Sequence, residues 1–176
     1  SNWTNFVETI FDWILSEYVH ILDKNVIGLY AIGDDMTWCL NSYDEQFADW
    51  LASIGKSVGQ EIKSEKTTNE KDQVKSLQRL FQRGYARPDG EIRAVYPTIR
   101  ALKSLVFPEK FHSPKDWSKD MEAIRAFMIL ENCVDHPLFT EFCEFVSNGD
   151  PHLKEFAHYT IAEQNNLYRR SKLITG

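Results

Sequence analysis

Two short β-prone runs enclose a Gly-Asp-Asp triplet, and this arrangement constrains the fold of the chain more than any other feature. The runs, residues 26–32 and 36–40, are rich in Val, Ile, Tyr, Thr and Trp. Gly33 between them can adopt the positive φ angle that a tight turn requires. The sequence therefore predicts a β-hairpin with Asp34 and Asp35 at its tip.

Adjacent carboxylates at such a tip are costly to keep charged, because like charges repel and the apolar flanks lower the local dielectric. A bound Mg²⁺ reverses this cost, since hard cations bind carboxylate oxygens and leave coordination positions for water and substrate phosphates. An ordinary hairpin turn that happens to contain Asp34 and Asp35 is the simpler interpretation of the triplet taken alone. A metal site therefore needs support from the sequence around it.

The rest of the chain divides into a mixed first half and a helical second half. Apolar residues at helical spacing and capping signals predict the helices, and β-prone runs between turn residues predict the strands. The predicted helices of the first half cover residues 4–22 and 43–54, the second opened by Ser42 with Glu45. Strands are predicted over 61–66 and 92–96, with a strand pair over 74–85 between them. Helices are predicted from Pro97 onward, the first burying Ile99, Leu102 and Val106. The pattern predicts an α+β fold, built either as two subdomains or as one continuous packing.

Charge is distributed unevenly along the chain. The net charge of −6 argues against a nucleic-acid partner when it is taken as a whole. Residues 56–115, however, contain thirteen Lys or Arg residues and seven Asp or Glu residues, a net charge of +6, and the remainder has a net charge of −12. A basic block of this kind suits a surface that follows phosphates, and a solvated face of mixed charge accounts for it equally well.

Cysteine usage and hydropathy narrow the class of protein. Cys39, Cys133 and Cys143 are an odd number without a CxxC pair, which favours thiols that fill the core in a reducing compartment. No stretch approaches the roughly eighteen uncharged apolar residues of a membrane span, and no secretory leader opens the chain. We therefore expect a protein that is neither secreted nor embedded in a membrane.

Several motifs follow one another in a recognisable order. Ser1-Asn2-Trp3-Thr4-Asn5 opens the helix before the Gly-Asp-Asp hairpin, a predicted strand ends at Lys66, and Leu77-Gln78-Arg79 lies in the next strand pair. The string over residues 93–105, which contains Tyr96-Pro97-Thr98, is the most specific. This order resembles the C-terminal portion of a viral RNA-dependent RNA polymerase of picobirnavirus or partitivirus type, from the end of motif B through motifs C, D and E into the thumb. The resemblance covers residues 1 to about 150.

The resemblance implies a partial polymerase palm over residues 1–95 and an α-helical thumb over residues 96–176. It also implies template-directed transfer of a nucleotidyl group from an NTP to an RNA 3′ end by two-metal catalysis with Mg²⁺ or Mn²⁺. The resemblance assigns catalysis and metal binding to Asp34 and Asp35. It implies that Lys66, or Lys63 as second choice, gives a proton to the leaving pyrophosphate. It also implies nucleotide and ribose binding by Ser1, Thr4 and Asn5, and RNA binding by Gln78, Arg79 and Arg83.

The resemblance further implies that the catalytic site is incomplete. The motif A aspartate, the other essential metal ligand of such enzymes, has no counterpart, because Asp44 and Asp49 follow the hairpin too closely and on a helix. We expect it upstream of Ser1, and we expect residues 1–176 alone to lack polymerase activity. The implied partners are RNA template, nascent strand, NTPs and the missing fingers and N-terminal palm, in the cytoplasm or the virion interior.

Two further hypotheses about the chain stay open. In a non-enzymatic acidic helical binding or adaptor protein, Asp34-Asp35 would be only a turn, and a self-contained fold with Asp34 buried would favour this hypothesis. A polymerase fragment or split subunit that works only with its other half predicts instead a large exposed apolar surface where that half packs.

Overall fold

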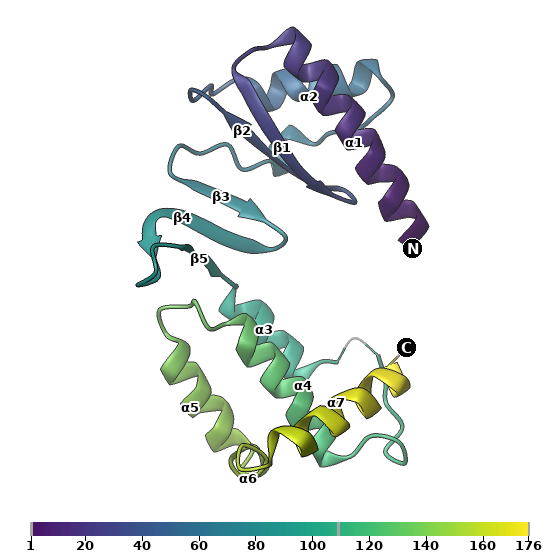
Figure 1. Cartoon of the computed structure of the whole chain (residues 1–176), viewed down its shortest axis with the longest axis vertical. Coiled ribbons are helices and arrows are strands. Elements are labelled where there is room, and N and C mark those ends of the chain that lie inside the picture. Colours follow the sequence, from purple (N-terminus) through teal and green to yellow (C-terminus); the bar gives the residue numbers. More distant parts are fainter. Residues whose placement is uncertain (1, 109, 176) are drawn as a thin grey trace. The chain divides into compact units, whose positions relative to one another are not determined.

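The computed structural model describes residues 2–108 and 110–175, and the chain divides into two compact units (Figure 1). The first unit ends at Arg93 and the second begins at Ala94. Helices and small antiparallel sheets make up the first unit, whereas helices make up nearly all of the second. The predicted mixed fold with a helical second half is confirmed, and the assignment of the halves to palm and thumb stays a prediction.

The first unit places a long helix beside a β-hairpin, followed by a shorter helix and a second small sheet. β1 pairs with β2, and the second sheet has the strand order β3-β4-β5. The elements are α1 (Asn2–Leu22), β1 (Val26–Ile32), β2 (Asp35–Leu40), α2 (Phe47–Ser57), the 3₁₀ turn η1 (Ser64–Lys66), β3 (Gln73–Ser76), β4 (Arg79–Ala86) and β5 (Ile92–Val95), whose last residues begin the second unit.

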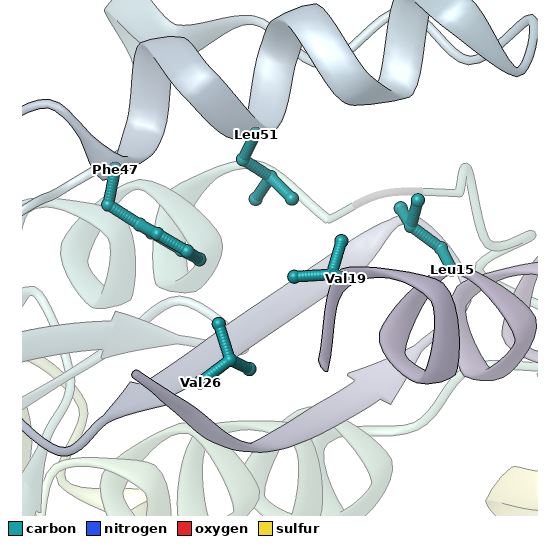
Figure 2. Packing of buried hydrophobic residues seen from close by; sticks show 5 residues of the cluster. All are labelled: Leu15, Val19, Val26, Phe47 and Leu51. Atoms are coloured by element: carbon teal, nitrogen blue, oxygen red, sulfur yellow. The ribbon is translucent and has the colours of Figure 1, made fainter. Parts of the chain in front are cut away.

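The core of the first unit lies between α1, the start of β1 and α2. Five buried side chains point toward one another there (Figure 2): Leu15, Val19, Val26, Phe47 and Leu51. The spacing of four residues within α1 and within α2 puts each pair on one helix face, which is why the apolar periodicity predicted these helices. Each fully buried side chain of this kind contributes about 1.5–3 kcal/mol to folding.

Two predicted boundaries in the first unit are wrong. Ser42 does not cap α2, because its hydroxyl and its backbone N–H both donate to Asn25 Oδ1, each at 2.9 Å, and so join the two ends of the hairpin. α2 begins at Phe47 without a side-chain cap. The segment that ends at Lys66 is not a strand, because hydrogen bonds between residues three apart, such as Lys66 N–H to the Lys63 carbonyl, form a 3₁₀ turn instead.

The second unit is built around one central helix. It contains α3 (Thr98–Val106), α4 (Lys119–Asn132), α5 (Phe139–Gly149), α6 (His152–Phe156) and α7 (Ile161–Thr175), and α4 contacts each of the other four. Met121, Ala123 and Ile124 of α4 are buried, and the Ser118 hydroxyl caps this helix by accepting from Met121 N–H. None of the helices in the described residues is long and apolar enough to cross a membrane.

The predicted buried face of α3 is mostly wrong. Ile99 is 84% exposed and Val106 is 69% exposed, whereas Ala101 is fully buried and Leu102 packs beside it. α3 therefore packs into this unit through Ala101, Leu102 and Leu105, and two of its large apolar side chains stay exposed.

We expect His152→Asn to remove a pH-dependent part of the stability of the second unit. Asp120 raises the pKa of His152, because its Oδ1 lies 2.8 Å from His152 Nε2. Burial lowers the pKa of His152, and the hydrogen bond with Glu155 raises it further. The folded chain thus holds the proton more tightly than the unfolded chain, so the stabilisation is full below about pH 6.5 and is lost as the pH rises through the folded-state pKa. Thermal unfolding at about pH 6 and about pH 8 should show the wild-type advantage shrinking at the higher pH.

The matched control is His158→Asn, because His158 is an exposed histidine just beyond α6. This variant should keep the wild-type dependence of stability on pH. A His152→Asn deficit that stays constant across the range would show that His152 acts through packing alone.

Candidate functional site

A two-residue turn carries the Gly-Asp-Asp triplet. Ile32 of β1 pairs with Asp35 of β2, so Gly33 and Asp34 alone connect the strands. Gly33 has φ +60°, and a glycine with positive φ at the first central position is typical of the type II′ hairpin turn. Asp34 and Asp35 are both exposed at this tip. The predicted hairpin with its acidic tip is confirmed.

The side of α1 that faces the tip holds the turn in place. Gly33 N–H donates to the Thr9 hydroxyl at 2.9 Å, and that hydroxyl in turn donates to the Asn5 carbonyl at 2.7 Å. A Cβ atom at position 33 would lie 3.3 Å from Cγ and Oδ1 of Asn5. Gly33 is therefore required twice, for its φ angle and for the close approach of the Asn5 side chain.

We expect Thr9→Val to loosen the tip and to lower the free energy of unfolding by about 1–3 kcal/mol, because the buried Gly33 N–H loses its acceptor. Hydrogen exchange at the Gly33 amide, measured by NMR, should accelerate with it. Thr9→Ser is the matched control, since it keeps the hydroxyl and should preserve the slow exchange. Equal exchange rates in the valine and serine variants would contradict this role of Thr9.

The carboxylates of Asp34 and Asp35 have the oxygen chemistry that Mg²⁺ or Mn²⁺ prefers. Two carboxylates are an incomplete set, however. Within residues 2–108 and 110–175, no three His, Cys, Asp or Glu side chains come close enough together to hold a metal ion. The donor chemistry at the tip thus fits a hard divalent cation, and a complete site would need further ligands.

The other predicted nucleotide-site residues lie on two segments. Thr4 and Asn5 are on α1, and of these two the side chain of Asn5 meets the tip. Ser1 lies outside the described residues. Lys66 is exposed on η1, and Lys63 just before this turn makes an ion pair with Glu61 at 3.9 Å. The structure therefore brings Asn5 to Gly33 of the turn and leaves the lysine roles as predictions.

The predicted RNA-binding residues lie on and after a second tight turn. Ser76 of β3 pairs with Arg79 of β4, so Leu77 and Gln78 form a two-residue turn with φ values of +47° and +65°. Positive φ at both positions is the type I′ pattern, which Asn and Gly normally occupy. Further along β4, Arg83 lies 3.4 Å from Asp72 in an exposed ion pair. The backbone strain at this tip resembles that found at functional sites in other proteins.

Replacing Gln78 with Gly should raise the free energy of unfolding by about 1 kcal/mol, because glycine adopts positive φ without the Cβ penalty. Gln82→Gly is the matched control on β4, which follows the turn, and it should destabilise by about 0.5–1 kcal/mol. Denaturant unfolding of both variants measures the difference. Destabilisation by both substitutions would mean that the Gln78 side chain stabilises the turn.

Comparison with known proteins gives a consistent result, although no protein-family model matches the chain. The crystal structure of the RNA-dependent RNA polymerase of a human picobirnavirus superposes with a TM-score of 0.79 at 26% identity, over 97% of this chain and 33% of that one. The crystal structure of its insertion-loop deletion mutant gives the same TM-score of 0.79 at 26% identity, and the match covers 96% of this chain and 32% of that one. A potential RNA-dependent RNA polymerase of Human picobirnavirus (strain Human/Thailand/Hy005102/-) is 36% identical over 152 residues. The chain is homologous to picobirnavirus RNA-dependent RNA polymerases.

This picobirnavirus polymerase homologue spans only about a third of the length of the relatives it matches. The aligned region covers 85% of this chain and 28% of the curated relative. The resemblance inferred from the motif order is therefore confirmed at the level of the family. The activity, substrates and partners of a whole polymerase remain proposals for this chain.

One residue that holds the candidate site in place was missed by sequence reasoning. Thr9 holds the Gly33 amide, yet nothing about an isolated threonine in a helix distinguishes it. Its spacing of four residues from Asn5 was the available signal, because this spacing places both residues on one helix face. Once Asn5 is assigned to the tip, Thr9 follows from the same geometry.

Proposed function

We propose that residues 1–176 form part of an RNA-directed RNA polymerase, with the C-terminal part of the palm over residues 1–95 and a helical thumb over 96–176. The observation that carries the proposal is an exposed pair of aspartates at a glycine turn that α1 fixes, in a chain homologous to picobirnavirus polymerases. A turn that is both rigid and accessible suits a ligand that must approach closely.

The proposed reaction joins the 3′-hydroxyl oxygen of an RNA to the α-phosphorus of an NTP, while the bond to pyrophosphate breaks. Asp34 is the principal metal ligand in this scheme, and Asp35 is the second. Mg²⁺ or Mn²⁺ bound there would lower the pKa of the attacking hydroxyl and neutralise charge on the leaving oxygens. Lys66 would give the departing pyrophosphate a proton, with Lys63 as second choice.

RNA and nucleotide contacts are proposed for two other parts of the first unit. Gln78, Arg79 and Arg83 would contact the primer strand, and contacts of arginine with phosphates set position without reading sequence. Thr4 and Asn5, with Ser1, would bind the incoming nucleotide and its ribose. The net charge of +6 over residues 56–115 supports an RNA surface here, since phosphate binding depends on Lys and Arg.

A broad apolar surface on α1 supports the proposal that the chain works with a further part of the polymerase. The outer face of this helix exposes Trp3 at 73%, Trp13 at 64% and Ile21 at 69%. Contiguous apolar surface of this kind usually marks an interface. We propose that the missing fingers and N-terminal palm, which would also carry the motif A aspartate, cover it.

A non-enzymatic adaptor is the second candidate function, and the observations favour it less. A self-contained fold with a buried and unapproachable Asp34 would favour it, whereas Asp34 is exposed. It also leaves the turn held by Thr9 and the homology to polymerases without a role. A location in the cytoplasm or the virion interior remains part of the polymerase proposal.

Primer extension with Mg²⁺ tests the proposal in two arms. Residues 1–176 alone should incorporate no nucleotide, because their described carboxylates make up only part of a metal site. A complete polymerase that carries these residues should extend the primer. In it, Asp34→Asn should lower the rate by more than the roughly 10–100-fold lost when a contact supporting a metal ligand is removed.

Asp49→Asn is the matched control, because Asp49 is an exposed carboxylate of the same unit on α2. It should extend the primer at close to the wild-type rate. A near-normal rate for Asp34→Asn would remove the metal assignment. Robust incorporation by residues 1–176 alone would show that the site is complete without an upstream aspartate.

A further inference from the structure

Asp12 is a buried acid that the proposed reaction does not use. It lies on the inner face of α1 and is 1% exposed. Its Oδ1 accepts a hydrogen bond from Gln60 Nε2 at 3.1 Å, just beyond the end of α2. The other oxygen of each group, Oδ2 of Asp12 and Oε1 of Gln60, is buried and has no hydrogen-bond partner among the described residues.

The two unpartnered oxygens belong to the two groups that this hydrogen bond already joins. An ionised carboxylate only accepts hydrogen bonds, and an amide oxygen also only accepts. With Asp12 ionised, neither oxygen can satisfy the other, and two buried acceptors stay without a donor. A single proton on Asp12 Oδ2 would make it a donor, and Gln60 Oε1 is an unpartnered acceptor on the side chain that Asp12 already contacts.

The electrostatic surroundings of Asp12 favour the same state. Burial raises the pKa of Asp12 above its ordinary value, the hydrogen bond from Gln60 lowers it, and the charges of Glu8 and Asp34 raise it. The ionisable side chains of α2, Asp49 and Lys56, point to solvent, as does Tyr30 of β1. No described cation therefore offsets a negative charge at this position.

We propose that Asp12 keeps its proton in the folded chain and forms, with Gln60, a neutral latch of two hydrogen bonds between α1 and the segment after α2. The latch is a carboxylic acid paired with a carboxamide. Asp12 Oδ2–H donates to Gln60 Oε1, and Gln60 Nε2–H donates to Asp12 Oδ1. When the proton is lost, the first bond breaks and the two oxygens repel each other.

The latch holds a segment whose path is already tightly constrained. Gln60 N–H donates to the Gly55 carbonyl at 2.8 Å, and Gly59 before it has φ +87°. A Cβ atom on Gly55 would lie 2.8 Å from Ile62 Cδ1, so this residue also fixes the path of the chain. The segment continues directly into η1, which carries Lys66.

Asp12 thereby acts as a positioning residue for the catalytic site. The same helix that fixes the aspartate tip through Thr9 also holds, three residues later, the segment that leads to Lys66. This consequence rests on the proposed function, whereas the latch itself does not. Loss of the proton at high pH would release the lysine segment from α1.

Asp12→Asn tests the latch in the 176-residue chain. Asparagine can make both hydrogen bonds to Gln60 without a titrating proton. Wild-type stability should therefore fall as the pH rises from about 5 to about 8, because a raised folded-state pKa favours the protonated native state at the lower pH. The asparagine variant should lose the part of this fall that His152 does not cause, and its unfolding temperature should exceed that of the wild type at about pH 8.

Two further measurements keep the test decisive. Infrared spectra of the wild type near neutral pH should contain a carbonyl band of a protonated carboxylic acid that Asp12→Asn lacks. Glu8→Gln removes a neighbouring charge without touching the latch, so it should leave that band in place. A missing band, or an asparagine variant that is less stable than the wild type at every pH, would overturn the proposal.

A functional arm separates the latch from the polymerase proposal. In an active complete polymerase, Asp12→Asn should flatten the fall of the extension rate at high pH, and Asp12→Ala should lower the rate at every pH. If the wild-type polymerase is active and its rate profile is unchanged by Asp12→Asn, the positioning role is wrong. An inactive wild type with the infrared band present would remove the proposed function and leave the latch standing.

Discussion

The packing of α1 against the β1–β2 hairpin is the contact on which the rest of the first unit depends. Leu15 and Val19 enter the core shared with α2, and Thr9, earlier on the same helix, accepts the Gly33 amide. A helix is rigid over such a length, so the side chains that build the core also determine where the acidic tip lies relative to α1. The tip is thus positioned both by hydrophobic packing of α1 and by the hydrogen bond from the Gly33 amide to Thr9.

Charge is arranged around this contact so that repulsion stays small. Asp34 and Asp35 stand in solvent, where water and salt screen their repulsion. Asp12 lies in the interior, where the same charge would be screened far less. A protonated Asp12 paired with Gln60 removes that buried charge while it keeps a polar connection between α1 and the segment after α2. Exposure to solvent thus reduces the repulsion between Asp34 and Asp35, and protonation avoids an unscreened charge at Asp12.

Local patterns predicted the hairpin well because its cause is local. Gly33 requires a turn, and the residues on either side of it favour strands whatever the remainder of the chain does. The predictions failed where the deciding partner is distant in sequence, as for Ser42, whose hydroxyl and amide are taken by the side chain of Asn25. Thr9 was missed for the same reason, because its partner lies twenty-four residues away.

The wrong prediction for α3 has another cause, and it bears on what the chain is. Apolar residues at helical spacing mark every face that a helix buries, whether the covering residues lie within residues 1–176 or in another part of a protein. Ile99 and Val106 of α3, and Trp13 of α1, follow such a pattern and are nevertheless exposed. A self-contained adaptor would have little reason to keep so many large apolar side chains in water. The picobirnavirus relatives are about three times as long as this chain, so the complete polymerase proposed above would offer these side chains further surface to pack against.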